Sequence, residues 1–346
     1  MVANRAIVIE EKLHTVARDI RIDFIKGMLM WSVVYGHSID ALCGGLPHNP
    51  VWLHLFVRTF DLPFFMVISG YFLRQSLQRK AFGRCFVDRV TMLFVPICFW
   101  TLLRGHLNVF IGMYYFLWAV LMCSIICAIA YKLKFYVKGR IGGAIEALFV
   151  CCIVMLLYFV NDPWNVFYLL PFFVFGYYVR DLRFSLSRGI IAVLCGLFII
   201  GLCYWSPDYT PWKVDAMAWR TEKSCIGIYV YRTVLGCVGV VVMGHIMVAI
   251  RGILGGTQLE SLIVNAGRET LAIYVLQSIA VEGLLRKGCY LAYNTFGVRG
   301  LDGGCLNLIG YVIAPVVSLF SIGFLLRVVK VIRSRRYTSW FFGFKV

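Results

Sequence analysis

Long apolar segments, separated by short polar ones, recur along almost the whole chain. An α-helix needs about 20 apolar residues to cross the hydrocarbon core of a bilayer, and most of these segments have close to that length. They predict about ten transmembrane helices. Their approximate ranges are 24–42, 54–73, 90–103, 109–130, 141–160, one ending near 178, one following Arg188, one ending near 251, 270–285 and 306–326. The pattern therefore predicts an all-α, polytopic membrane protein.

The longest polar interruption lies at about residues 206–224. Residues 74–89 form a strongly basic segment that we expect to be a loop, and Asn161-Asp162-Pro163 separates the fifth apolar segment from the sixth. A glycine-rich loop is expected before the last span, and a basic tail follows it. Ten helices take about 200 residues. We therefore expect one transmembrane domain over residues 1–346, with no separate soluble domain.

Composition agrees with this interpretation. The chain is 61% hydrophobic and only 15% charged, with a mean hydropathy of +0.81, whereas soluble domains carry about 25% charged residues. The net charge of +17 comes from Lys and Arg in alternate polar segments. That distribution encodes membrane orientation, and it predicts that both termini face the cytoplasm. A nucleic-acid partner is not expected.

The 13 cysteines lie mostly inside apolar segments, and no CxxC pattern occurs. We interpret them as small packing residues rather than disulfide partners or metal ligands.

The first apolar segment carries an unusual polar stripe. Asp23, Lys26, His37 and Asp40 share one face of a helix over residues 18–40, and Lys26 and His37 lie about three turns apart. Ionisable groups inside a membrane helix are costly, so they indicate function by default. The alternative for His37 is a neutral imidazole that a neighbouring carbonyl satisfies. Histidine is also the side chain best suited to accept a proton near neutral pH.

Several motifs occur in a characteristic order. The run D-x-x-K-x(10)-H, from Asp23 to His37, is followed by FDLPFFMVISGYF, then by Arg89 ahead of Pro96. Later come YFLWAVL, LPFFVFGYYVR and GRETLAIYVLQ. Together they resemble the acyltransferase 3 family of integral membrane acyltransferases over nearly the whole chain.

The chain departs from the family pattern at four positions. Lys26 stands where many members have arginine. Met92 stands where the second arginine of a basic R-x-x-R motif is expected, and Arg74 or Arg84 would take over part of the role of that arginine. Asp61 and Gln277 occupy positions where members often have histidine.

The resemblance implies transfer of an acyl group, usually acetyl from acetyl-coenzyme A, to a hydroxyl of a cell-surface glycan or another acceptor. His37 would be the base for that hydroxyl or would carry the acyl group transiently. Asp23 and Lys26 lie too far along the helix to touch His37, and they would act at the cytoplasmic mouth. The implied site residues are, as catalytic groups, His37, Asp23 and Lys26; for the donor, Arg84, Arg89, Ser69, Gly70 and Tyr71; for the acceptor, Asp40 and Asp61. No metal is expected.

Other interpretations stay open for some residues. Basic residues of segment 74–89 also fit orientation charges, and Ser69, Gly70 and Tyr71 also fit ordinary helix packing. Arg58 and Asp61 would pair locally, or they would line the acceptor entrance with Asp40. Arg232 and Glu282 are further intramembrane charges and candidate partners across helices, with no role assigned.

The expected partners are the lipid bilayer and a glycan or lipid-linked glycan acceptor, in the inner membrane of a bacterium. The alternatives are acylation of a lipid, peptide or small molecule, a transporter or flippase, and a purely structural membrane protein.

Overall fold

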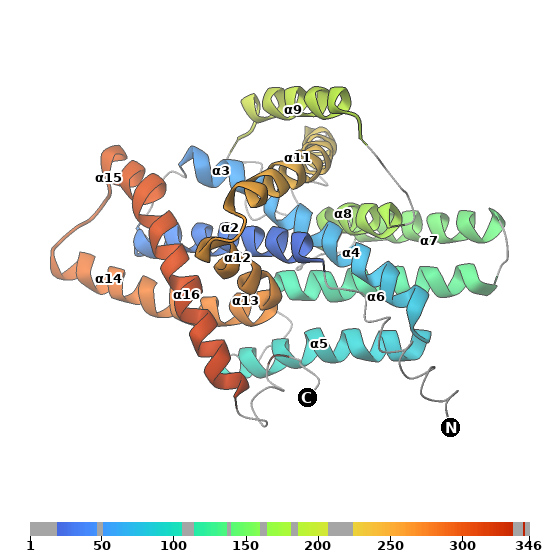
Figure 1. Cartoon of the computed structure of the whole chain (residues 1–346), viewed down its shortest axis with the longest axis horizontal. Helices are drawn as coiled ribbons and strands as arrows, with labels where there is room; N and C mark the ends of the chain where they lie inside the picture. Colours follow the sequence, from blue (N-terminus) through green and yellow to red (C-terminus); the bar gives the residue numbers. More distant parts are fainter. Residues whose placement is uncertain are drawn as a thin grey trace.

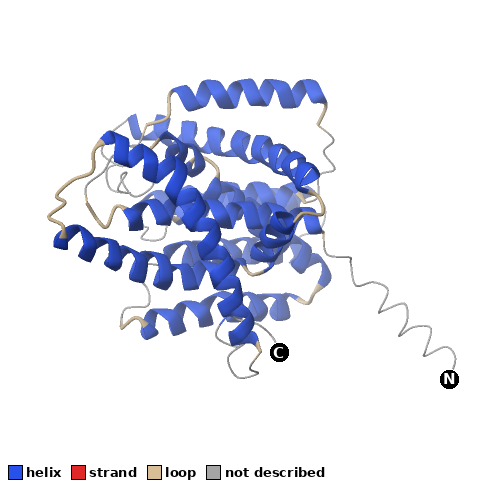
Figure 2. Ribbon diagram, turned by 60° about the vertical axis from the view of Figure 1, so that its left-hand side comes forward, coloured by secondary structure: helices blue, strands red, loops and turns tan. Residues whose placement is uncertain are grey.

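The computed structural model describes residues 19–46, 51–105, 114–136, 140–159, 165–180, 186–206, 224–334 and 342. Over these ranges every regular element is a helix, which confirms the all-α prediction (Figures 1 and 2). In chain order they are α2 (Ile20–Leu42), α3 (Trp52–Arg58), α4 (Asp61–Arg79), α5 (Phe82–Leu103), α6 (Tyr115–Tyr136), α7 (Arg140–Phe159), α8 (Val166–Val179), α9 (Arg188–Cys203), α11 (Ser224–Leu254), α12 (Gln258–Arg268), α13 (Thr270–Ile279), η2 (Ala280–Leu285), α14 (Arg286–Thr295), α15 (Gly303–Leu308), η3 (Ile309–Ile313) and α16 (Ala314–Arg333).

The protein is a multi-pass membrane protein. Within the described residues, five helices are long and apolar enough to cross a bilayer: Trp52–Arg79, Phe82–Leu103, Tyr115–Lys134, Gly227–Leu254 and Gly303–Arg333. Three shorter helices are also apolar: Ile141–Val154, Val166–Val179 and Arg188–Cys203. The predicted count of ten spans and the orientation of the termini stay predictions.

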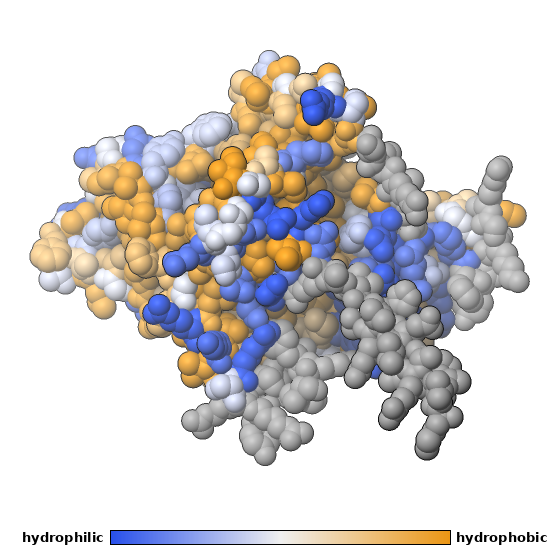
Figure 3. Space-filling model, in the orientation of Figure 1, coloured by the Kyte–Doolittle hydropathy of each residue, from blue (hydrophilic) through white to orange (hydrophobic). Residues whose placement is uncertain are grey.

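Large apolar side chains face outward on several helices. Leu197 on α9 and Phe320 and Phe324 on α16 are each more than half exposed. Figure 3 shows apolar residues gathered over α9 and over the α15–α16 side of the molecule. A soluble protein rarely exposes apolar surface of this extent, whereas lipid tails solvate it without cost.

The basic segment 74–89 is not the loop that we predicted. Helix α4 continues to Arg79 and α5 begins at Phe82, so only Lys80 and Ala81 connect them. Arg, Gln and Leu are strong helix formers, and the helices continue past the end of their apolar stretch for that reason. The prediction was based on hydropathy, which shows where an apolar stretch ends but not where its helix ends.

The prediction near the C-terminal third was also incomplete. Helices α13, η2 and α14 run on from Thr270 to Thr295, through a region where a loop was expected after residue 285. Helix α12 was not predicted at all, because it is too polar and too short to read as a span. Asn161-Asp162-Pro163 and most of the polar segment 206–224 lie outside the described residues.

Helix α2 lies in the middle of the bundle and packs against α12, α13, η2, α14, α16, α11, α4 and α3 (Figure 1). Its closest neighbour is α12. A Cβ built on Gly27 would overlap with the backbone carbonyl of Ile263, and one built on Gly267 would overlap with the carbonyl of Asp23. The two backbones therefore touch directly, as small residues allow between membrane helices.

A second crossing of the same kind joins α4 to α8. A Cβ on Gly70 would overlap with the carbonyl oxygen of Phe173, and a Cβ on Gly176 would overlap with that of Val67. The two glycine-lined crossings hold α2 and α4, which carry most of the predicted site residues, against the rest of the bundle.

Replacing Gly267 by alanine should destabilise the protein, because α2 and α12 would have to separate to admit the added Cβ. Overpacking costs about 1–3 kcal/mol, so we expect a lower midpoint of thermal unfolding for the purified protein in detergent. Gly323→Ala is the matched control, because a Cβ there meets no described atom within 4 Å. Equal midpoints for the two variants would show that the crossing tolerates a Cβ.

Candidate active site

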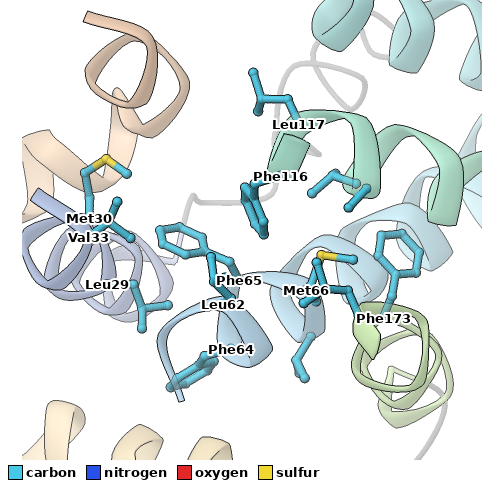
Figure 4. Packing of buried hydrophobic residues seen from close by; sticks show 14 of the residues in the cluster. Leu29, Met30, Val33, Leu62, Phe64, Phe65, Met66, Phe116, Leu117 and Phe173 are labelled. Atoms are coloured by element: carbon cyan, nitrogen blue, oxygen red, sulfur yellow. The ribbon is translucent and has the colours of Figure 1, made fainter. Parts of the chain in front are cut away.

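A cavity of about 380 Å³ lies between α2, α4, α5, α6 and α13. One end carries ionisable side chains: Lys26 on the first turns of α2, Lys80 after α4, and Asp88 and Arg89 on the first turns of α5. The rest of the wall is mainly apolar. Figure 4 shows six of its residues on α2, α4 and α6: Met30, Val33, Leu62, Phe65, Phe116 and Leu117. A charged mouth leading to an apolar interior suits a ligand with an anionic head and an uncharged arm.

The cavity follows the helices lengthwise. On α2 its wall is formed by Lys26, Met30 and Val33, at spacings of four and three residues that keep to one helix face. His37 is the next residue of that face, one turn beyond Val33. On α4 the lining residues have the same spacing and continue from Ser76 inward to Leu62. The cavity therefore leads from the basic end of the bundle toward His37.

His37 pairs with a carboxylate from the other side of the bundle. Its Nδ1 lies 3.2 Å from Oε1 of Glu282, and each side chain is about one quarter exposed. Gln277 donates from Nε2 to the same Glu282 oxygen at 3.0 Å. Glu282 belongs to η2, a π-helical turn, and such turns occur frequently at functional sites. A carboxylate on Nδ1 orients the imidazole and leaves Nε2 to accept a proton.

A buried cation lies beside this pair. Arg58 donates from Nε to Nε2 of His54 at 3.1 Å, and its Nη1 lies 3.4 Å from Oδ2 of Asp61. A Cβ on Gly36, the residue before His37, would lie 3.0 Å from Nη2 of Arg58. His37 interacts electrostatically with Glu282, Arg58, Asp40 and Asp61. The local pair between Arg58 and Asp61, one of our two alternatives, is confirmed.

Tyrosines surround these charges. Tyr114 and Ser278 share a hydrogen bond of 2.9 Å between their hydroxyls. Tyr115 and Tyr274 both interact electrostatically with Arg58 and Glu282. Together with His37, these groups form a polar chamber inside an apolar bundle.

The predicted catalytic residues separate into two places. His37 lies in the polar chamber, whereas Lys26 lines the charged end of the cavity. Asp23 is 3% exposed and lies 3.4 Å from Nε of Arg268 on α12, so it joins α2 to α12. Asp40 lies half-buried one turn beyond His37.

The residues predicted to bind the donor also divide. Ser69 and Arg89 line the cavity. Gly70 instead contacts α8, and Tyr71 accepts a hydrogen bond from Nη1 of Arg180. Arg84 is exposed and is not among the residues of the cavity wall. Hence the structure brings two of these five together.

Arg74, which we expected to take over part of the role of the missing second arginine, lies away from the cavity. Its Nη1 contacts Oε1 of Glu146 at 3.5 Å and the hydroxyl of Tyr177 at 2.7 Å, and it is 5% exposed. Lys134 reaches the other oxygen of Glu146 at 3.2 Å. These groups link α4, α6, α7 and α8 in a buried network away from the cavity.

Sequence reasoning missed the partner of His37. Glu282 stood out as a charge inside an apolar segment, but nothing in the sequence places it opposite His37, 245 positions away. The spacing of five residues between Gln277 and Glu282 is typical of one face of a π-helix, which α-helical periodicity does not test. Among the described residues, no three His, Cys, Asp or Glu side chains converge as metal ligands would.

Comparison with known proteins identifies a family and two similar proteins. The family of acyltransferase domains matches residues 19–329. The chain is 34% identical to nodulation protein NolL of Sinorhizobium fredii over 30% of this chain and 34% of that protein. It is 30% identical to nodulation protein NolL of Mesorhizobium japonicum over 32% of this chain and 35% of that protein.

The match thus spans about a third of the length of these curated relatives. No solved structure matches the chain significantly. Because the family match covers nearly the whole bundle, including the cavity and the polar chamber, the chain belongs to the acyltransferase 3 family of membrane proteins.

Proposed function

We propose that this protein is a membrane-embedded O-acyltransferase. It would move an acyl group, acetyl in the simplest case, from coenzyme A to a hydroxyl of a cell-envelope glycan such as an O-antigen or exopolysaccharide unit. One observation carries the proposal: the face of α2 that lines the cavity from Lys26 to Val33 leads directly to the His37–Glu282 pair. The acceptor class rests on the family alone.

The charged end of the cavity suits the phosphates of coenzyme A. Arg89 forms no salt bridge with any described carboxylate, so its guanidinium is available to an anion. At the same mouth, Lys80 lies 2.8 Å from Oδ2 of Asp88, so this pair carries no net charge and Lys26 and Arg89 supply the positive charge for the phosphates. The apolar wall would then accommodate the uncharged pantetheine arm.

His37 would act as the general base. Its Nε2 takes the proton of the acceptor hydroxyl, the hydroxyl oxygen attacks the thioester carbonyl, and the bond from that carbon to sulfur breaks. The proton then passes to the departing thiolate. Glu282 holds the imidazole in orientation and stabilises its charged form, and Arg58 supplies positive charge beside the developing oxyanion.

The proposed orientation follows from the donor. Coenzyme A is cytoplasmic, so the end of the bundle with Lys26, Lys80 and Arg89 faces the cytoplasm of a bacterial inner membrane, with both termini on that side. The acceptor would approach His37 from the opposite face, near Asp40 and Asp61.

Two alternatives make different predictions. A lipid or small-molecule acceptor leaves the donor side unchanged and alters only the product. A transporter or flippase moves its substrate without covalent change and needs no acyl donor. Mass spectrometry of envelope glycans from matched strains with and without this chain decides between them, because O-acetylation adds one acetyl mass to the glycan.

His37→Ala should abolish most acyl transfer while the protein inserts and folds normally. Loss of a general base lowers the rate by about 10²–10⁴-fold. The measurement is acetylation of envelope glycans, with membrane abundance determined in parallel. His245→Ala is the control, because His245 is exposed on α11 and contacts only the carbonyl of Val241 in the described structure. Full acetylation with His37→Ala would remove His37 from the mechanism.

Glu282→Gln should preserve the shape of the pair but remove the charge that stabilises imidazolium. We expect a fall in kcat of roughly a hundredfold or more, with the KM for acetyl-coenzyme A little changed because Glu282 does not line the cavity. Steady-state kinetics of membranes or nanodiscs measure both. Wild-type kcat in this variant would show that the carboxylate is not needed.

Arg89→Ala should weaken donor binding. Hydrogen bonds to charged groups contribute about 1.5–3 kcal/mol, so we expect the KM for acetyl-coenzyme A to rise by about 10- to 100-fold with a similar kcat. Arg84→Ala tests the other sequence-based assignment, and its exposed position predicts a KM close to that of the wild type. If the two variants exchanged these effects, Arg84 rather than Arg89 would contact the donor.

A further inference from the structure

The cavity wall does not include the His37–Glu282 pair. Val33, Leu62 and Tyr274 line its inner end, whereas His37, Arg58 and Glu282 are not part of its wall. His37 lies four positions after Val33 on α2, which is about 6 Å along the helix axis. The wall of the apolar cavity on α2 therefore ends about one helical turn before His37.

Three aromatic rings from three helices meet in the cavity wall. Phe65 of α4 and Phe116 of α6 meet edge to face with 6.0 Å between ring centroids. Phe116 and Tyr274 of α13 lie 5.9 Å apart. Figure 4 shows the rings of Phe65 and Phe116 side by side, with Phe65 extending toward Met30 and Val33. All three rings line the cavity.

The rings are held in place from behind. Tyr274 packs against Tyr114 with 6.3 Å between ring centroids. The hydroxyl of Tyr114 forms a hydrogen bond with the hydroxyl of Ser278, which lies one turn after Tyr274 on α13. Phe65 and Phe116 are 9% and 7% exposed. Aromatic side chains packed in this way have few rotamers available, so the space beside them has a defined size.

We infer that Phe65, Phe116 and Tyr274 form an aromatic constriction that selects the length of the acyl group. This inference rests on the proposed function, in which the thioester must pass from the cavity to His37. An acetyl group adds one methyl beyond the thioester carbon, whereas propionyl and butyryl add further methylenes that must fit among the rings. The constriction admits the short group and excludes the longer ones.

The expected size of this selection follows from how strongly enzymes discriminate between substrates that differ by one methylene. One methylene in an apolar pocket changes kcat/KM by about 10- to 200-fold. Shortening a ring of the constriction to leucine should therefore change the ratio of propionyl to acetyl transfer by about tenfold or more. If the rings served only to pack the core, the substitutions would lower the transfer of every acyl group equally, because less protein would fold.

The test uses membranes that contain the full chain, incubated with isotope-labelled acetyl-, propionyl- or butyryl-coenzyme A. Mass spectrometry of the extracted glycans and lipids measures which acyl groups are transferred. The variants are Phe116→Leu and Phe65→Leu, two independent changes in case one fails to fold. Phe64→Leu is the matched control: Phe64 is buried on the same helix, but its ring lies near Gly244 of α11 and not in the cavity wall.

We expect both variants to raise the propionyl-to-acetyl ratio by about tenfold or more, and the control to keep the wild-type ratio. An unchanged ratio in both variants, with acetyl transfer by the wild type, overturns the constriction and leaves the proposed function intact. A ratio that rises equally in Phe64→Leu also overturns it, because the change would reflect general loosening. Absence of acyl transfer by the wild type from every donor overturns the proposed function itself.

Discussion

Contact between α2 and the segment α12–α14 determines where His37 lies relative to Glu282. At one end, Gly27 and Gly267 bring the two backbones together. At the other end, the hydroxyl of Tyr293 donates to the carbonyl of Leu42. Between these two points, η2 must lie alongside the middle of α2, and that is where Glu282 meets His37. The close approach at the two glycines therefore helps to hold His37 and Glu282 opposite each other.

The cost of isolated charge in an apolar environment explains how the ionisable groups are arranged. Those away from the cavity are neutralised in pairs that also join helices: Asp23 with Arg268, and Arg333 with Glu269 at 2.5 Å. Arg232 is an exception, since it is 2% exposed and lies over the ring of Tyr168 at 4.0 Å. At the cavity mouth, Lys80 and Asp88 are paired in the same way, with 2.8 Å between Nζ and Oδ2.

The sequence predicted the membrane class, the helical fold and the separation of Lys26 from His37, because hydropathy and helix periodicity are local properties. Helix ends were less well predicted. The polar stretch 74–89 is largely helical, since strong helix formers extend α4 and α5 beyond their apolar parts. Helix α12 was missed because it is amphipathic and short, yet it is the closest partner of α2.

By itself, the sequence determined which side chains could do chemistry and the face of α2 on which they lie. Motif order also indicated the family. Only the tertiary structure decided that Glu282 is the partner of His37, that Ser69 and Arg89 line the cavity whereas Gly70 packs against α8, and that three aromatic rings from three helices meet in the cavity wall. The reason is physical: these are contacts between residues far apart in the chain, and they depend on which helices pack together and at what rotation.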